Sequence, residues 1–157
     1  MPSVKPGDTI AVTGANGLVA SHCIKVLLAK GFDVAACVRD PTNETKVAHL
    51  KAMAEGAAGS IVFYKSSLDV DGSYDEAFEG AQGIIHTAAV VHDHWSLSLL
   101  DSHIQGTTRV VESAKKSSTL KRFIQTSSIA AIIDPFVHEK DPEHVFTEKD
   151  FNQTEDP

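Results

Sequence analysis

A glycine-containing turn follows a short apolar segment near the start of the chain, at Thr13-Gly14-Ala15-Asn16-Gly17-Leu18-Val19-Ala20. A glycine at the first position permits a tight turn, and the second lets backbone N–H groups approach an anion without an intervening Cβ. A helix that starts directly after the turn adds unpaired N–H groups and partial positive charge. This spacing indicates a phosphate-binding turn where a strand precedes it and a helix follows it.

The residues on either side of the turn have the required patterns. The segment 9–13 is apolar or β-branched at successive positions, as in a strand that is covered on both faces. The segment 17–30 has apolar residues at helical spacing, and Gly31 is a natural end for that helix. We therefore interpret the turn as the phosphate site of a dinucleotide-binding fold.

Strands and helices alternate from there to about residue 127. Further strands are expected at 32–38, 60–64, 83–88 and 122–127, and helices at 45–56, 74–79 and 97–116. This alternation requires parallel pairing through right-handed crossovers. We expect a three-layer α/β Rossmann-type fold with a doubly wound parallel sheet of about five strands in the order 3-2-1-4-5. The ligand should bind beyond the carboxyl ends of strands one and four.

The last part of the chain has a different character. Residues 134–157 contain three prolines and many charges without clear periodicity, and we expect a loop-rich tail there. The dinucleotide-binding domain should accordingly span residues 1–133.

An arginine follows the second predicted strand, in Val38-Arg39-Asp40. NAD sites usually have an acidic residue there for the ribose 2′-hydroxyl, whereas an arginine suits the 2′-phosphate of NADP(H). Two other interpretations stay open at this stage: Arg39 is a solvated charge at the strand end, or Asp40 faces a ribose. We favour NADP over NAD.

Composition excludes several classes of partner. The formal charge of −7 is not accompanied by a basic patch, so we expect no nucleic-acid partner. No apolar run approaches the roughly 20 residues that span a membrane, and we expect a cytoplasmic protein without a membrane partner. Cys23 and Cys37 are expected to be small buried residues and not a disulfide. The spacing of His92-Asp93-His94 fits no usual zinc pattern, so no metal is expected.

The whole set of motifs resembles the extended short-chain dehydrogenase/reductase superfamily, also called the NAD-dependent epimerase/dehydratase family. The resemblance is strongest to the group of dihydroflavonol 4-reductases, cinnamoyl-CoA reductases and fungal aldehyde/ketone reductases. It rests on the glycine turn together with four further segments. They are Arg39-Asp40-Pro41-Thr42-Asn43, Ser67-Leu68-Asp69, His86-Thr87-Ala88-Ala89 and Arg122-Phe123-Ile124-Gln125-Thr126-Ser127-Ser128.

The resemblance implies a role for particular residues. Arg39 and Lys46 would hold the 2′-phosphate, Asp69 would contact the adenine amino group with Val70 beside it, and Ser128 would be the catalytic serine. The remaining expected cofactor contacts come from the turn and from the fourth strand: Thr13, Gly14, Ala15, Asn16, Gly17, Leu18, Val19, Thr87, Ala88 and Ala89.

The resemblance also implies reduction of a small carbonyl substrate, for which the family uses a tyrosine and a lysine four residues later. The only tyrosines here are Tyr64 and Tyr74, which are followed at that spacing by Leu68 and Phe78. We therefore expect a truncated chain without the C-terminal substrate region and incomplete for catalysis. A non-catalytic NADP-binding accessory protein and a fragment with little function of its own remain alternatives. A fifth strand with an open edge would favour self-association or binding to a complementary chain.

Overall fold

The structure is a computed structural model that describes residues 3–90 and 97–152. The chain separates into two compact units, Met1–Gln125 and Thr126–Pro157. The strands of the first unit are β1 (Thr9–Thr13), β2 (Asp33–Val38), β3 (Ile61–Lys65), β4 (Gly83–His86) and β5 (Arg122–Gln125). Its helices are α1 (Leu18–Ala29), α2 (Glu44–Ala54), α3 (Asp75–Phe78) and α4 (Leu97–Lys116).

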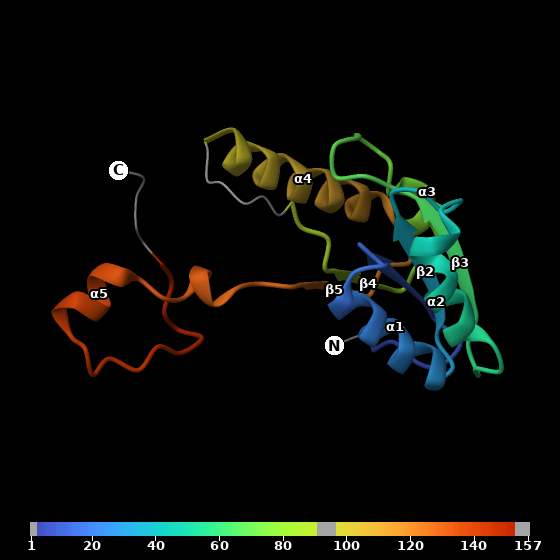
Figure 1. The fold of residues 1–157 in the computed structure, drawn as a ribbon, viewed down its shortest axis with the longest axis horizontal. Coiled ribbons are helices and arrows are strands. Elements are labelled where there is room, and N and C mark those ends of the chain that lie inside the picture. Colours follow the sequence, from blue (N-terminus) through green and yellow to red (C-terminus); the bar gives the residue numbers. More distant parts are fainter. Residues whose placement is uncertain (1–2, 91–96, 153–157) are drawn as a thin grey trace. The chain divides into compact units, whose positions relative to one another are not determined.

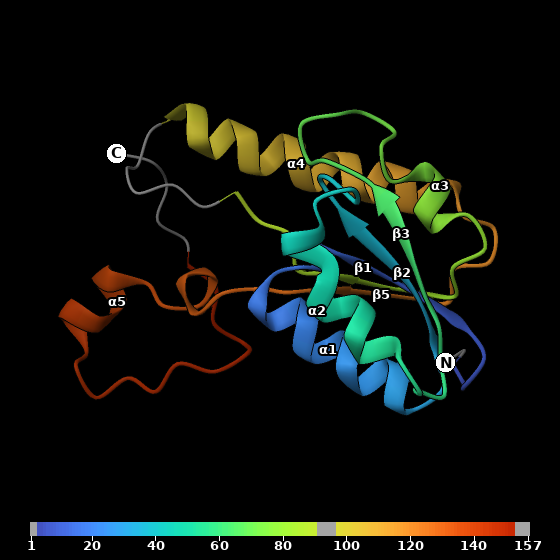
Figure 2. The ribbon, with the colours of Figure 1, turned by 45° about the vertical axis from the view of Figure 1, so that its right-hand side comes forward.

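The five strands form one parallel sheet in the order β3-β2-β1-β4-β5, which confirms the predicted fold class. Helices α1 and α2 cover one face of the sheet, and α3 and α4 cover the other (Figures 1 and 2). The order reverses between β1 and β4, because the chain winds outward in both directions from β1. Parallel sheets of this kind bind ligands outside the carboxyl ends of the strands at that reversal.

Each face of the sheet has its own apolar core. Side chains of α1 and α2, including Ile24, Leu28 and Leu50, pack against one face of β1, β2 and β3. Phe78 of α3 and Val110 of α4 pack against the other face. Successive residues of β1 and β2, which point to opposite faces of the sheet, are buried alike. The unbroken apolar runs in the sequence therefore correctly indicated a sheet that is covered on both sides.

The strand ends differ from expectation where side chains take over backbone hydrogen bonds. Strand β4 ends at His86 and does not continue to Ala88. The backbone N–H groups of Thr87 and Ala88 both donate to the hydroxyl oxygen of Thr13, so they are not available to the sheet. Strand β5 ends at Gln125, before the predicted end at Ser127.

The second unit is more ordered than predicted. It contains a 3₁₀ turn, Ile129–Ala131, and the helix α5 (Pro135–Lys140), in a region where we expected only a loop-rich tail. The sequence did not indicate this helix. Proline is well suited to the first turn of a helix because its missing N–H has no intrahelical partner there, and Pro135 occupies the first position of α5. The division between the units lies at Gln125, whereas the sequence placed the domain boundary after residue 133.

Two further sequence expectations concern general properties of the chain. None of the helices in the described ranges is long and apolar enough to cross a membrane. Both cysteines are free thiols; Cys37 is buried as expected, whereas Cys23 on α1 is partly exposed.

Candidate cofactor-binding site

A cavity of about 710 Å³ opens at the carboxyl ends of β1, β2, β3 and β4, entirely within the first unit. This is the place where a doubly wound sheet binds its ligand. The residues that line the cavity are Gly14, Asn16, Gly17, Cys37, Val38, Arg39, Ser66, Ser67, Leu68, Asp69, Tyr74, Thr87, Ala88, Ala89, Val90 and Ser102.

The glycine turn forms one wall of this cleft. Gly14 has a φ of +62°, in the left-handed region that favours glycine, and a Cβ there would lie 3.0 Å from the Cα of Ala88. Gly17 is the N-cap of α1, and no side chain caps that helix end. The first turn of α1 also contains no acidic residue. A pyrophosphate fits this wall, since the backbone can approach it closely and the helix end presents N–H groups and partial positive charge.

Thr13 and His86 hold the turn against the end of β4. The Thr13 hydroxyl oxygen accepts hydrogen bonds from the backbone N–H groups of Thr87 and Ala88, each at 3.1 Å. It lies 2.6 Å from Nδ1 of His86, so its own proton is left to donate to that nitrogen. The Thr87 hydroxyl in turn donates to the Thr13 carbonyl oxygen at 2.6 Å. This network assigns His86 as a neutral imidazole protonated at Nε2, and burial of the ring lowers its pKa in the same sense.

Arg39, at the end of β2, places a positive charge beside the cleft. Arg39 is exposed, lines the cavity and has no hydrogen-bond or ion-pair partner in the described part of the chain. The neighbouring Asp40 is engaged with its own chain, because its Oδ1 accepts from the Thr42 hydroxyl at 2.6 Å and from the Thr42 N–H at 2.9 Å. These hydrogen bonds hold the pKa of Asp40 below its ordinary value. Asp40 does not line the cavity.

Helix α4 supports the loop that follows β3. Arg109 donates from Nη1 to the Leu68 carbonyl oxygen at 3.0 Å and forms an ion pair with Asp71. Gly106 packs beneath the same loop, where a Cβ would lie 3.2 Å from the Cβ of Leu68. Because Leu68 lines the cavity, these contacts fix one wall of the cleft.

Three buried residues, Cys37, Ser66 and Tyr74, also line the cavity. Ser66 is 4% exposed and Tyr74 is 2% exposed. Burial raises the pKa of the Cys37 thiol to about 12, and it raises that of the Tyr74 phenol well above its ordinary value. Both groups therefore stay neutral near pH 7, and Tyr74 is unsuited to proton transfer at that pH.

The structure brings together eight of the residues that sequence reasoning placed at the cofactor site. Gly14, Asn16, Gly17, Arg39, Asp69, Thr87, Ala88 and Ala89 all line the cavity. Six others do not: Thr13 and Ala15 are buried, whereas Leu18, Val19, Lys46 and Val70 are exposed. Sequence reasoning missed Cys37, Val38, Ser66, Ser67, Leu68, Tyr74, Val90 and Ser102. The position of Ser66 just after a predicted strand, at the edge of the sheet where ligands bind, was the one available signal.

The remaining predicted features lie elsewhere. Ser128 belongs to the second unit, where its exposed hydroxyl accepts from the Ala130 N–H at 3.2 Å and caps the 3₁₀ turn. His92, Asp93 and His94 lie outside the described residues. Within the ranges that are described, no three histidine, cysteine or acidic residues gather as metal ligands would.

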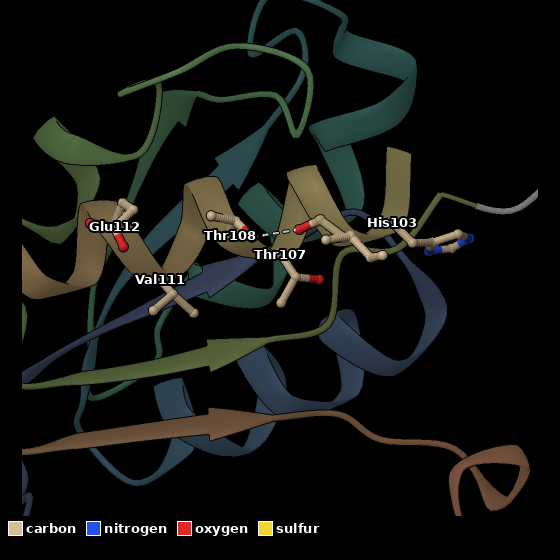
Figure 3. Close-up of a pocket in the computed structure, with 6 residues that line it drawn as sticks. His103, Thr107, Thr108, Val111 and Glu112 are labelled. Atoms are coloured by element: carbon tan, nitrogen blue, oxygen red, sulfur yellow. Dashed lines mark hydrogen bonds between the residues drawn. The ribbon is translucent and has the colours of Figure 1, made fainter. Parts of the chain in front are cut away.

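A second hollow, of about 580 Å³, lies along α4 (Figure 3). Its lining comes from this single helix and consists of His103, Ile104, Thr107, Thr108, Val111 and Glu112. The Thr108 hydroxyl donates to the Ile104 carbonyl oxygen of its own helix. Polar groups from several elements do not converge here as they do in the cleft, so the cleft is the better candidate for a small-molecule site.

A glycine turn at the switch point of a parallel sheet gives this chain the Rossmann-type fold that dinucleotide-binding proteins share. It belongs to the NAD dependent epimerase/dehydratase family, whose family model matches residues 10–155. This finding confirms the resemblance described from the sequence.

Curated relatives agree on the subgroup. The chain is 39% identical over 135 residues to a cinnamoyl-CoA reductase of Medicago truncatula, which covers 84% of this chain and 41% of the relative. It is 36% identical over 128 residues to a dihydroflavonol 4-reductase of Solanum lycopersicum, covering 79% of this chain and 33% of the relative. The chain thus spans about two-fifths or less of the length of these relatives.

Solved structures agree on the fold. The structure of Gre2 from Candida albicans in complex with NADPH matches with a TM-score of 0.78 and 27% identity, over 94% of this chain and 45% of that one. Vestitone reductase from alfalfa matches with a TM-score of 0.69 and 27% identity, over 92% and 43% of the respective chains.

Proposed function

We propose that this chain forms the NADPH-binding part of a reductase that acts on small aldehydes or ketones. The observation that carries the proposal is the unpartnered guanidinium of Arg39, which lies at the end of β2 beside the glycine turn. A planar cation suits the 2′-phosphate that distinguishes NADPH from NADH. The hydrogen bonds between Asp40 and Thr42 also support NADPH over NADH. A carboxylate that faced the ribose would favour NADH, but the Asp40 carboxylate is already bonded within its own turn.

Each part of the cleft then has a task. The turn from Gly14 to Gly17 and the first turn of α1 bind the pyrophosphate, and Arg39 with Lys46 binds the 2′-phosphate. Asp69 faces the adenine, and Thr87 to Ala89 line the nicotinamide side beyond β4. Bound NADPH supplies the hydride that reduces a carbonyl carbon. Ser128 is proposed to orient the carbonyl oxygen by a hydrogen bond.

The proton donor is proposed to come from residues other than the two tyrosines of this chain. Tyr74 is buried with a raised pKa, and neither Tyr64 nor Tyr74 is followed at four residues by a lysine. A phenol needs a nearby cation to act as an acid near neutral pH. We therefore expect the 157 residues to bind NADPH more effectively than they turn over a carbonyl substrate.

Titration of the chain with NADPH and NADH, followed by calorimetry and thermal unfolding, tests the proposal. Saturation at 100 times the dissociation constant should stabilise the folded state by about 2.7 kcal/mol. A scan of aldehydes and ketones for loss of NADPH absorbance then measures turnover. Absence of NADPH binding would refute the proposal, and binding without turnover with any carbonyl would leave the accessory role.

We also propose that β5 pairs with another chain. In the sheet formed by the described residues β5 is an edge strand beside β4, and Ile124 on it is 50% exposed. Unprotected sheet edges pair with other strands. Light scattering at micromolar concentration should give a mass above the monomer mass of 16.8 kDa, and Ile124→Lys should return the mass to that of the monomer. Val62→Lys on the opposite edge strand, β3, is the matched control. A monomeric wild-type chain contradicts the proposal.

A further inference from the structure

The inner wall of the cleft contains two hydroxyl groups whose presence the fold itself does not explain. Of the buried side-chain oxygen and nitrogen atoms in the described residues, only Ser66 Oγ and Asp75 Oδ1 lack a hydrogen-bond partner, and Asp75 does not line the cavity. The Ser66 hydroxyl acts on the thiol of Cys37. The hydroxyl partly opposes the rise in its pKa, but the two groups do not meet hydrogen-bond geometry. The Tyr74 hydroxyl also forms no hydrogen bond within the described residues, but its oxygen is not among these fully buried atoms, although the residue as a whole is 2% exposed.

A buried hydroxyl without a partner is destabilising, and replacement by an apolar group of similar shape is neutral or favourable. Such a group in a binding cleft is explained if a ligand completes its hydrogen bonds. Ser66 and Tyr74 both line the cavity while they are 4% and 2% exposed. Neither residue is needed by the turn, by Arg39 or by the Thr13–His86 network.

The surroundings of the two hydroxyls select the part of the ligand. Ser66 directly follows β3, the outermost strand on the side of the sheet away from β4, so it belongs to the adenosine end of a dinucleotide that crosses β1. Val38, Leu68 and the neutral thiol of Cys37 line the same cavity. Apolar walls with two neutral hydroxyls suit a flat heteroaromatic base, whereas a phosphate binds better to charged donors or to the N–H groups at a helix start.

We propose that the Ser66 and Tyr74 hydroxyls form hydrogen bonds with the adenine base of the bound dinucleotide. A hydroxyl can both donate and accept, which matches the ring nitrogens and the amino group of adenine. This inference rests on the proposed function, because it assigns a further recognition contact within the same cleft.

Calorimetric titration of wild type, Ser66→Ala and Tyr74→Phe with NADPH and with adenosine 2′,5′-bisphosphate tests the inference. Each substitution should weaken both ligands by the same factor, about three- to tenfold, which corresponds to one neutral hydrogen bond. Binding of reduced nicotinamide mononucleotide, which has no adenine, should not change. Tyr64→Phe is the matched control, since Tyr64 is half-buried on β3 and does not line the cavity.

Thermal unfolding without ligand separates recognition from structure. Ser66→Ala should unfold at the same temperature as wild type or at a higher one, because it removes an unpartnered hydroxyl. A lower unfolding temperature would show that the hydroxyl already has a partner in the protein, and this would overturn the inference. A crystal structure of the adenosine 2′,5′-bisphosphate complex should place both oxygens within about 3.2 Å of adenine nitrogens; a base seated elsewhere would also overturn it.

The two proposals fail in different ways. If the wild-type chain does not bind NADPH, the proposed function fails and the adenine contact fails with it. If the wild-type chain binds NADPH and the two variants bind it equally well, or lose no more affinity than Tyr64→Phe, only the adenine contact is refuted.

Discussion

Replacement of Arg39 by alanine isolates the contribution of one guanidinium to the choice between NADPH and NADH. The side chain is exposed and has no partner among the described residues, so its removal leaves no buried group unpaired. The free energy of unfolding without ligand should therefore change by less than about 0.5 kcal/mol. Any effect on NADPH binding can then be assigned to the missing contact and not to a damaged fold.

The size of that effect follows from the exposure of the site. A charge-assisted hydrogen bond to phosphate contributes about 1.5–3 kcal/mol when it is shielded from water, and solvent at an exposed guanidinium reduces this. A net value of about 1–2 kcal/mol corresponds to a roughly 5- to 30-fold weaker Kd for NADPH. NADH has no 2′-phosphate, so its Kd should change by less than about twofold.

Calorimetric titration of both cofactors at two salt concentrations measures this difference. The wild-type preference for NADPH should decrease as salt increases, because exposed charges are screened. Lys25→Ala on α1 removes an exposed cation away from the cleft and controls for the change in net charge. Equal losses of NADPH and NADH affinity in Arg39→Ala would refute the assignment of the 2′-phosphate to this residue.

Three further substitutions test the architecture of the cleft. Gly14→Ala should lower the free energy of unfolding by about 1–3 kcal/mol in urea titration, because Gly14 has a positive φ and its Cβ would lie 3.0 Å from the Cα of Ala88. Gly80→Ala is the control, since Gly80 has a similar φ but no atom of the described residues lies near the added Cβ. An equally large loss in Gly80→Ala would contradict the role of the contact with Ala88. Arg109→Gln should release the Leu68 loop and weaken NADPH binding by about two- to tenfold in calorimetry, whereas Lys115→Gln, which breaks only a surface pair with Glu112, should leave it unchanged. The pKa of His86 is lower in the folded chain than in the unfolded chain, so the unfolded chain binds more protons as the pH falls. The free energy of unfolding should therefore be unaffected by this histidine above its unfolded pKa of about 6.5. Below that pH it should decrease by at most about 1.4 kcal/mol per pH unit. His86→Asn should remove this component when urea unfolding is compared at pH 5 and pH 7, and an unchanged pH dependence would assign it to other groups.

The sheet and its order were predictable because burial on both faces leaves a continuous apolar signal in β1 and β2, and because parallel strands require helical crossovers. Element ends were less predictable. The hydrophobic pattern continues through Thr87 and Ala88, but the backbone N–H groups of both are bound by a side chain that is 74 or 75 positions away. Local sequence contains no signal for such a long-range competitor.

The second unit contains a short helix, α5, that the sequence did not indicate. The prolines and charged residues around α5 leave no regular spacing of apolar residues, and the sequence therefore indicated a loop. The same proline is compatible with a helix when it occupies the first turn, where α5 has Pro135. Composition alone does not distinguish a proline that starts a helix from one that prevents it.

The cleft was predictable in its backbone and less so in its side chains. A glycine turn and the residue that follows a strand can both be recognised from the sequence. Gly14, Gly17 and Arg39 could therefore be assigned to the cleft in advance. Thr13 was expected to contact the cofactor for the same reason, whereas Ser66 was not noticed. Both are hydroxyl residues at the carboxyl end of a strand: Thr13 ends the buried strand β1, and Ser66 follows β3, whose residues are half-buried or exposed. The two hydroxyls differ in their hydrogen-bond partners.

That difference is what separates a structural hydroxyl from a binding one. The Thr13 oxygen has two N–H donors and a histidine acceptor within hydrogen-bond distance, so the fold already satisfies it and a ligand could gain nothing from it. The Ser66 oxygen is equally removed from water and has no such partners. Since an unsatisfied buried hydroxyl is unfavourable in the free protein, ligand binding at Ser66 would relieve a penalty as well as form a contact. Ser66 is therefore proposed as a recognition residue because of its missing hydrogen-bond partner among the described residues and not because of its position along the chain.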